Sequence, residues 1–365
     1  MNSVLRQDLD YILSKLSKDE TTKFAGATVL ITGCAGFLGF SFMHFFVQHA
    51  RRLGIERLIG LDTFILGRPP WVEQLEKERP ELLTVRSFDV SKDEIGAVPN
   101  ANKASYIIHG ASIASPTFYR RYPIVTLDAN IWGLRHLLDF YKGQALKGFL
   151  FFSSSEIYGD PDDQNIPTPE EYRGNVACVG PRACYDESKR FGETMCYLFA
   201  KEYGMPITVA RPFNNFGPGM RLDDRRVPAD FAQCILHNKP IEILSSGRPT
   251  RTFCYVADAI AGYLKCLLHG QYDSFNIGIE TPEVSVVELA SIYKRAGEKL
   301  AGYAHGVNFS KSDDRDYLTH NPNRRCPTIK KARKLLKYEP EIPVDAGIER
   351  FLAFLIEEKE KGYMQ

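Results

Sequence analysis

The sequence predicts an α/β protein built on a doubly wound parallel sheet, and two observations support this fold class. First, short apolar runs alternate with amphipathic helical segments over residues 27–210. Second, a glycine-rich turn lies directly between the first apolar run and the helical segment that follows it. Strands that are buried on both faces have continuous apolar runs, and parallel neighbours need helical crossovers. The alternation therefore indicates a sheet covered by helices on both faces.

The elements follow in a regular order along the first part of the chain. The expected strands cover residues 27–32, 57–62, 83–88, 106–109, 148–152 and 207–210. Helices are expected over residues 37–52, 123–142 and 183–203. Apolar residues at Leu5, Leu9, Ile12 and Leu16 recur at helical spacing, so residues 1–26 are expected to form a helical extension and not a membrane anchor.

Domain boundaries follow from a change in composition near residue 213, where Gly, Pro and Arg become frequent. Residues 27–212 are expected to form the first domain, and residues 252–278 to return to it. A smaller C-terminal α/β region would comprise residues 213–251 and 279–365. Within it, residues 303–328 are polar and predict a loop beside a site.

Composition excludes several classes of partner. The 365 residues include 46 Lys plus Arg and 45 Asp plus Glu, for a net charge of +1, which predicts no nucleic-acid partner. No apolar run approaches a bilayer span, so no membrane contact is expected. The eight cysteines form no CxxC pair, which favours reduced thiols in the cytoplasm, and no metal-ligand spacing is visible.

The glycine-rich turn predicts a dinucleotide site. Gly33 permits the tight turn, Gly36 lets the backbone approach a pyrophosphate, and Gly39 allows close packing of helix on strand. The spacing GxxGxxG differs from the common GxGxxG of Rossmann folds. Asp62 ends the second strand, where a carboxylate accepts ribose hydroxyls and repels the 2′-phosphate of NADP, so NAD is favoured. Arg68 nearby tempers this preference, because an arginine there could accommodate a phosphate.

Two further patterns predict chemistry on a hydroxyl. Tyr185 and Lys189 lie four residues apart at the start of a helix and share one face. A cationic Lys189 would lower the pKa of the Tyr185 phenol, which could then take a proton while hydride leaves the same carbon. Ser154 and Glu156 follow the fifth strand, at the sheet edge where doubly wound proteins bind ligands.

The chain resembles the extended short-chain dehydrogenases/reductases that act on nucleotide sugars as epimerases, dehydratases or decarboxylases. Among these, its pattern is most similar to the UDP-glucuronate decarboxylases. The resemblance extends from Ala27 to about Phe354. It is carried by the stretches 109–116, 153–161, 180–190 (GPRACYDESKR), 193–197, 211–218 and 250–253.

The resemblance implies a role for each matching position. NAD would contact Gly33, Gly36, Phe37, Leu38, Gly39, Asp62, Asp89, Val90, Ala111, Tyr185 and Lys189. The nucleotide sugar, most of all a UDP-sugar, would contact Ser115, Asn214, Arg226, Arg251, Tyr255 and Arg325. Catalytic roles would fall to Ser154, Glu156, Tyr185, Lys189 and Arg325, with Arg325 near the sugar carboxylate. A homodimer that pairs residues 123–142 and 183–203 across a two-fold axis is also implied.

The expected reaction is a decarboxylation through transient oxidation. Tyr185 would deprotonate the sugar 4-hydroxyl as hydride passes to NAD, the resulting β-keto acid would lose carbon dioxide, and returned hydride would restore the cofactor. A 4-epimerase is the main alternative, since it needs only the Ser, Tyr and Lys set. A 4,6-dehydratase is disfavoured because Ser155 stands where such enzymes usually have an Asp.

Two further observations bear on the function. A sensor that binds a dinucleotide without turnover is a further alternative, but such proteins tend to lose Tyr185 or Lys189, and both are present. Residues 303–325 are longer than the equivalent loop of the decarboxylases. Because this loop should line the sugar pocket, the identity of the sugar stays open.

Overall fold

The first region is a seven-stranded sheet whose hydrogen-bonded strands are all parallel, in the order β11-β6-β5-β4-β1-β2-β3. The computed structural model describes residues 1–312, 316 and 319–362. The strands are β1 (Thr28–Thr32), β2 (Arg57–Asp62), β3 (Leu83–Ser87), β4 (Ala104–His109), β5 (Gly148–Phe152), β6 (Ile207–Pro212) and β11 (Asp273–Ile277). The predicted fold class is confirmed, and each expected strand is present.

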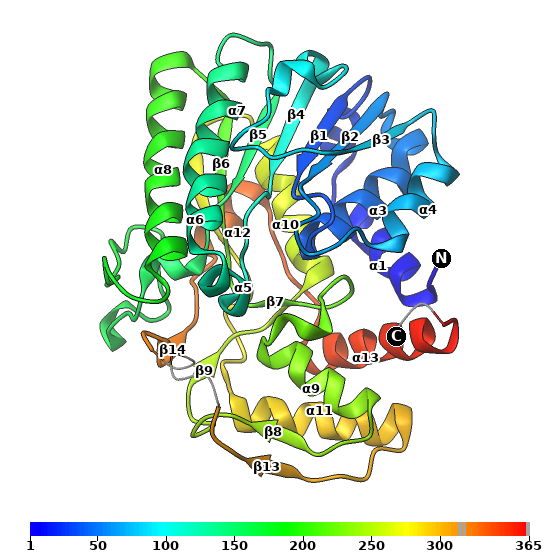
Figure 1. Cartoon of the computed structure of the whole chain (residues 1–365), viewed down its shortest axis with the longest axis vertical. Helices are drawn as coiled ribbons and strands as arrows, with labels where there is room; N and C mark the ends of the chain where they lie inside the picture. Colours follow the sequence, from blue (N-terminus) through cyan, green and yellow to red (C-terminus); the bar gives the residue numbers. More distant parts are fainter. Residues whose placement is uncertain (313–315, 317–318, 363–365) are drawn as a thin grey trace.

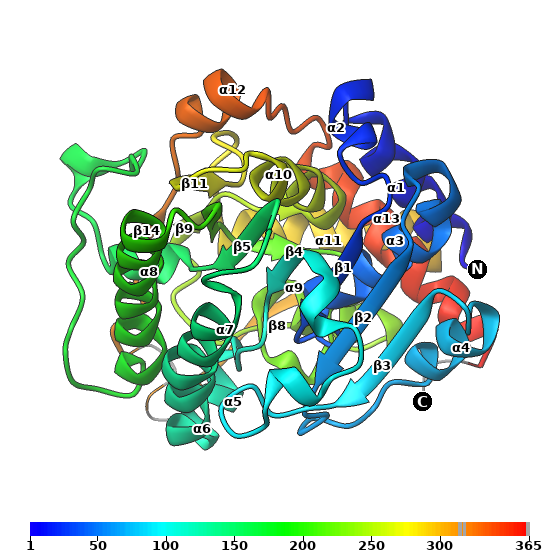
Figure 2. The ribbon, with the colours of Figure 1, turned by 90° about the horizontal axis from the view of Figure 1, so that it is seen from above.

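Both faces of the sheet are buried, as the continuous apolar runs predicted. Along β1, Val29 and Ile31 belong to one apolar core and Leu30 to another, because successive side chains of a strand point to opposite faces. The first core includes α3 (Phe37–Leu53) and α10 (Val256–Leu268), and the second includes α7 (Leu134–Tyr141) and α8 (Ala183–Tyr203). Figure 2 shows the two helical layers on either side of the strands.

The predicted helix over residues 123–142 forms in three segments. They are α6 (Pro123–Asp128), a π-helical turn η3 (Ala129–Gly133), and α7. The remaining helices of this region are α4 (Pro70–Glu78) after β2 and α5 (Pro116–Arg121) after β4. At the carboxyl end of β5, the 3₁₀ turn η4 (Ser155–Tyr158) begins directly after Ser154.

The second region lies below the carboxyl ends of the strands in Figure 1. It contains α9 (Val227–Leu236), β8 (Ile241–Ile243), α11 (Val286–Ala301) and β13 (Val307–Phe309), with β13 paired to β8. A small sheet joins β9 (Thr250–Arg251) to β12 (Val284–Ser285) and to β14 (Arg324–Arg325). The prediction of a loop throughout 303–328 is therefore wrong for β13 and β14; residues 313–315 and 317–318 lie outside the described residues.

The stretch predicted to return to the first domain adds α10 and β11 to it, with β11 paired to β6. The strands β7 (Asn215–Phe216) and β10 (Cys254–Tyr255) pair with each other between the two regions. The chain ends with α12 (Lys330–Leu336) against β11 and with α13 (Val344–Glu360) against α11. Among the described residues, no helix has the length and apolar character needed to cross a membrane.

The N-terminal extension forms α1 (Ser3–Ser14) and α2 (Lys18–Thr22), and α1 packs on α3, α10 and α13. Its apolar stripe is buried, as the spacing predicted. Two buried carboxylates fasten it. Asp8 accepts hydrogen bonds from the Tyr255 hydroxyl (2.5 Å) and from Arg350 (3.1 Å), and Asp258 accepts one from Tyr11. We call these five residues the N-terminal clasp.

Candidate active site

The glycine-rich turn lies where β1 meets α3, at the carboxyl edge of the sheet. Gly33 has φ +71°, and a Cβ there would lie 2.6 Å from the carbonyl oxygen of Gly110. At Gly39, a Cβ would lie 2.4 Å from the carbonyl oxygen of Cys34. Only glycine fits at either position, so the turn brings bare backbone and the amino end of α3 to one point. Such an end carries free N–H groups and a partial positive charge, which suits a pyrophosphate.

A cavity of 190 Å³ extends from this turn along the edge of the sheet. Its lining includes the predicted residues Gly33, Gly36, Phe37, Asp62, Asp89, Val90, Ala111 and Ser115. Asp62 accepts hydrogen bonds from the backbone N–H groups of Ala35 (3.0 Å) and Phe64 (2.9 Å), which fixes its carboxylate at the wall. Arg68 pairs with Glu76 and lies over the Phe64 ring, so these two partners already engage the guanidinium that could accommodate a phosphate.

The far end of this cavity is closed by a segment from the second region. Arg221 donates a hydrogen bond to the carbonyl oxygen of Leu66 (2.8 Å), and the Ser115 hydroxyl donates one to that of Asp224 (2.9 Å). Ser115 therefore lies in the dinucleotide cavity and ties two loops together, whereas the sequence placed it against the sugar. The Asp89 carboxylate accepts from Ser91 and Lys92, so it is already satisfied locally.

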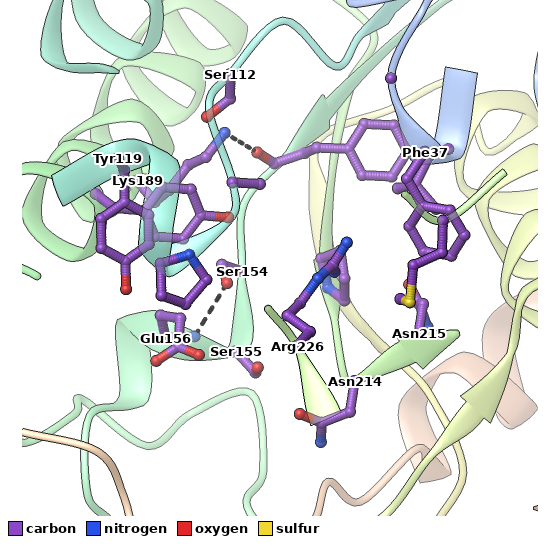
Figure 3. Close-up of a pocket in the computed structure, with 18 of the residues that line it drawn as sticks. Phe37, Ser112, Tyr119, Ser154, Ser155, Glu156, Lys189, Asn214, Asn215 and Arg226 are labelled. Atoms are coloured by element: carbon purple, nitrogen blue, oxygen red, sulfur yellow. Dashed lines mark hydrogen bonds between the residues drawn. The ribbon is translucent and has the colours of Figure 1, made fainter. Parts of the chain in front are cut away.

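A larger cavity of 370 Å³ continues from the glycine-rich turn into the space between the two regions. Its lining brings together Gly33, Gly36, Phe37, Leu38, Gly39, Ser154, Ser155, Glu156, Tyr185, Lys189, Asn214, Arg226, Arg251 and Arg325. In Figure 3, Tyr119, Lys189 and Glu156 lie on one side and Phe37 and Asn215 on the other, with Arg226 between them. Residues that follow β1, β5 and β6, residues of α8 and residues of the second region thus meet at one place.

Tyr185 and Lys189 lie one helical turn apart in α8, and both side chains are buried. The Lys189 ammonium donates to the carbonyl oxygen of Phe152 (2.8 Å) and lies 5.7 Å from the centre of the Tyr185 ring. Burial raises the pKa of Tyr185 to about 12 and lowers that of Lys189 to about 7. The prediction that Lys189 lowers the Tyr185 pKa is therefore wrong for the chain by itself, because burial outweighs any effect of the ammonium.

Next to this pair lies a buried row of alternating charges. Glu156 makes ion pairs with both Arg182 and Arg325, and Asp186 lies 3.5 Å from Arg182 on its other side. We call Glu156, Arg182, Asp186 and Arg325 the pocket cluster. Burial would raise the pKa of Glu156, but the two guanidinium groups outweigh burial and lower it to about 2. Burial and repulsion from Glu156 raise the pKa of Asp186 to about 7.

Comparison with known proteins agrees with this geometry. The model of the NAD dependent epimerase/dehydratase family matches residues 29–278. The chain belongs to this family.

The curated relatives include decarboxylases of nucleotide sugars. The chain is 35% identical to UDP-glucuronic acid decarboxylase 1 of Xenopus tropicalis, over 91% of this chain and 73% of the relative. It is 32% identical to UDP-glucuronic acid decarboxylase 6 of Arabidopsis thaliana, over 88% of this chain and 86% of the relative. Among solved structures it is similar to an epimerase of Methanothermobacter thermautotrophicus, with 26% identity, a TM-score of 0.77, and coverage of 94% and 96%.

A second solved structure shares the fold. It is the UDP-glucuronic acid 4-epimerase of Bacillus cereus, which was crystallised with UDP-glucuronic acid and NAD. The identity is 23%, the TM-score is 0.72, and the alignment covers 90% of this chain and 99% of that one. NAD, the cofactor of this family, would fit three parts of the chain: the glycine-rich turn, the amino end of α3 and the cavity wall at Asp62.

The residues predicted to contact the nucleotide differ in their positions and in their hydrogen-bond partners. Arg226 lines both cavities and pairs with Asp224, and Asn214 lines the larger cavity and donates to the Thr252 carbonyl oxygen (2.9 Å). Arg251 also lines the larger cavity, but its guanidinium donates to the carbonyl oxygens of Pro322 and Asn323. It therefore holds the 321–323 segment at the cavity wall.

The predicted position of Tyr255 is wrong. The sequence placed it beside the nucleotide, but its side chain is fully buried and its hydroxyl donates to Asp8 in the N-terminal clasp. The physical reason is that β10 directs this ring toward α1 and α13, away from the cavity. Nothing in the local sequence indicates that direction, because the partner lies near the other end of the chain.

Sequence reasoning missed Tyr119, Arg182 and Asp186. The Tyr119 ring stacks on that of Tyr185, with centroids 5.2 Å apart and an angle of 11° between the planes. Arg182 precedes Tyr185 by one helical turn and lines the cavity. The stretch GPRACYDESKR contains Arg182 and Asp186, but charged residues in a helical first turn ordinarily face solvent. Contacts of α8 with η4 and α5, which lie far from it in the sequence, bury them.

Proposed function

We propose that the chain is an NAD-dependent UDP-glucuronate decarboxylase that works by transient oxidation at C4 of the sugar. The observation that carries this proposal is the pair Arg182 and Arg325, which face the cavity beside Tyr185 and Ser154. Planar guanidinium groups suit a carboxylate, and two of them share only one fully ionised partner, Glu156. The decarboxylase names of the curated relatives support the same substrate.

Each residue of the site has a separate role in this reaction. Ser154 orients the 4-hydroxyl, and the phenolate form of Tyr185, a minor form in the free chain because burial raises its pKa to about 12, takes the hydroxyl proton. A bound NAD supplies the hydride acceptor for this oxidation and the hydride for the final reduction. In the 4-keto sugar, the C5–C6 bond breaks, its electron pair enters the C4 enolate, carbon dioxide departs, and C5 takes one proton from solvent. Arg325 and Arg182 hold the carboxylate, and Glu156 orients both guanidinium groups.

Ser155 disfavours dehydration in this proposal. A 4,6-dehydratase must deliver a proton to the leaving 6-hydroxyl, and a serine hydroxyl is a poor acid. Here the Ser155 hydroxyl accepts a hydrogen bond from Arg325 (3.3 Å), so it belongs to the wall that faces the carboxylate. The alternative that needs no further group is 4-epimerisation.

The product mass distinguishes these reactions. Mass spectrometry after incubation of the NAD-loaded enzyme with UDP-glucuronate is expected to show loss of one carbon dioxide. An isomer of unchanged mass would establish a 4-epimerase instead, and loss of one water a dehydratase. Tyr185→Phe is expected to abolish turnover while NAD binding, followed by titration calorimetry, is kept. Full activity in this variant would refute the assignment.

We also propose a homodimer formed through α6, η3 and α8. Four large apolar side chains on these neighbouring helices are half or more exposed: Ile124, Trp132, Phe191 and Leu198. Burying such a patch against a second copy would be favourable. Trp132→Asp is expected to give a monomer in sedimentation experiments, whereas Phe309→Asp, an equally exposed apolar residue on β13, is expected to leave the dimer intact. A Trp132→Asp dimer of wild-type affinity would refute the interface.

A cytoplasmic location is the last part of the proposal. The eight cysteines are all among the described residues and are all free thiols, as a reducing compartment allows. Fractionation of cells that express the tagged chain is the test, and recovery with a secretory compartment would contradict it.

A further inference from the structure

Asp186 occupies an unusual position behind the arginine that faces the sugar. It follows Tyr185 directly in the first turn of α8, and its side chain is only 9% exposed. One carboxylate oxygen, Oδ2, lies 3.5 Å from Arg182 Nε, and the other, Oδ1, has no hydrogen-bond partner. Arg182 Nε also lacks a partner. A buried carboxylate with a bare oxygen is costly in its ionised form, so a protonated form is within reach.

The net charge of the pocket cluster depends on this one carboxyl group. Two arginines and two ionised carboxylates sum to zero, whereas protonation of Asp186 leaves one positive charge. Glu156 is held ionised by direct ion pairs with Arg182 and Arg325, so it does not compete for the proton. The other titratable groups that interact electrostatically with Asp186 are Tyr119 of α5 and Cys184 and Tyr185 of α8. All three are neutral, because burial raises their pKa values.

A ligand with a negative charge changes the balance. If a sugar carboxylate reaches Arg182 and Arg325, the cluster would contain three negative groups and two positive ones. Loss of the charge on Asp186 balances the charges of the pocket cluster and the bound carboxylate, and a buried charge without a counter-charge is costly. A nucleotide sugar whose C6 is a hydroxymethyl group brings no such charge to this end of the cavity.

We propose that Asp186 is a positioning residue that sets the charge Arg182 and Arg325 present to the sugar, taking up one proton as a uronate carboxylate binds. This inference rests on the proposed function, since it requires a carboxylated sugar in the cavity. The proton comes from solvent and adds to the carboxylate of Asp186; no other bond changes. The rise in the pKa of Asp186 to about 7 in the free chain agrees with such a proton near neutral pH.

The test measures proton uptake during binding. The NAD-loaded Tyr185→Phe variant prevents turnover, and calorimetric titrations in two buffers of different ionisation enthalpy count the protons taken up. With UDP-glucuronate, uptake of up to about one proton is expected, and above about pH 7 the affinity should fall by as much as about tenfold per pH unit. With UDP-glucose, neither effect is expected.

Adding Asp186→Asn tests the residue itself. The double variant is expected to bind UDP-glucuronate without proton uptake and with an affinity independent of pH in this range. A merely structural role would weaken both ligands alike and leave the proton count unchanged; either result overturns the inference. Asp8→Asn is the matched control, because Asp8 is also a buried carboxylate with a raised pKa but lies in the N-terminal clasp. It should retain the wild-type proton uptake.

The outcomes separate this inference from the proposed function. If the wild-type enzyme releases carbon dioxide from UDP-glucuronate but Asp186→Asn leaves proton uptake intact, only the inference fails. If the wild-type enzyme leaves UDP-glucuronate unchanged, or converts it to an isomer or a dehydrated product, the proposed decarboxylation fails whatever the proton count shows.

Discussion

The pocket cluster and the N-terminal clasp are both buried groups of acids and bases, yet they are bonded differently. In the clasp, both carboxylate oxygens of Asp8 and of Asp258 accept hydrogen bonds, those of Asp258 partly from the backbone N–H groups of Glu341 (3.0 Å) and Ile342 (2.8 Å). In the pocket cluster, Arg182 and Asp186 each keep an atom without a partner. The clasp also lies outside both cavities, whereas three members of the pocket cluster line the larger one.

This difference indicates that the N-terminal clasp stabilises the fold, whereas the pocket cluster has polar atoms that are free to bind a ligand. A saturated network stabilises the native state, and removing one member leaves the others buried and unpaired. A network beside a cavity whose polar atoms are not all paired can form further hydrogen bonds when a ligand binds. The clasp is therefore expected to govern stability and the pocket cluster to govern activity, and substitutions in each can test the separation.

The largest expected effect is on activity, in the pocket cluster. Arg325→Ala should lower kcat/KM for UDP-glucuronate by about 10²–10³-fold, because a buried guanidinium that holds the sugar carboxylate is lost. The unfolding midpoint should change little, because Glu156 retains its ion pair with Arg182 and its carboxylate lines a cavity that water can enter. Arg325→Lys is the control that keeps the charge but loses the planar fork, and it should lie between. Wild-type turnover in Arg325→Ala would contradict the role.

The next effect is on stability, in the clasp. Asp8→Ala should reduce the free energy of unfolding by about 2–3 kcal/mol, because it leaves the buried Tyr255 hydroxyl without its partner and removes the ion pair to the partly exposed Arg350. Urea denaturation measures the loss, and kcat should be unchanged at temperatures where the variant is folded. Asp10→Ala, two residues away with a side chain 63% exposed, should cost less than about 0.5 kcal/mol.

A smaller loss is expected for Tyr11→Phe. It removes one hydrogen bond to the Asp258 carboxylate, worth about 1.5–3 kcal/mol, and the two backbone donors that remain place the loss at the lower end. Tyr197→Phe, on the exposed face of α8, is the control. A marked fall in kcat for Tyr11→Phe would show that the two groups are coupled.

The smallest effect is a dependence of stability on pH. Burial raises the pKa of Asp8 to about 6 from 3.8, so the folded chain binds this proton more tightly than the unfolded chain does. Stability relative to Asp8→Asn should therefore fall as the pH rises from about 4 to about 6, by at most about 1.4 kcal/mol per pH unit, and it is the change per pH unit that is the smallest of these effects. A flat or rising difference across this window would contradict the assignment.

Local patterns were sufficient where neighbours in sequence are also neighbours in space. The strand runs, the helical stripe at Leu5 to Leu16, the glycines at Gly33 and Gly39, and the Tyr185–Lys189 spacing all formed as predicted. The same patterns could not indicate that the Tyr255 ring turns toward Asp8, or that residues 307–309 pair with β8. Those contacts join segments far apart in the chain.

The sequence by itself determined the doubly wound sheet, the glycine-rich turn and the spacing of Tyr185 and Lys189, because period, glycine placement and helical spacing are local properties. Only the tertiary structure decided the charge of the pocket cluster. Glu156, Arg182 and Arg325 come from three separate elements, and burial together with their mutual attraction sets which groups are ionised. Tyr185 shows the same limit, since its position was predictable but its pKa depends on how completely the surrounding elements bury it.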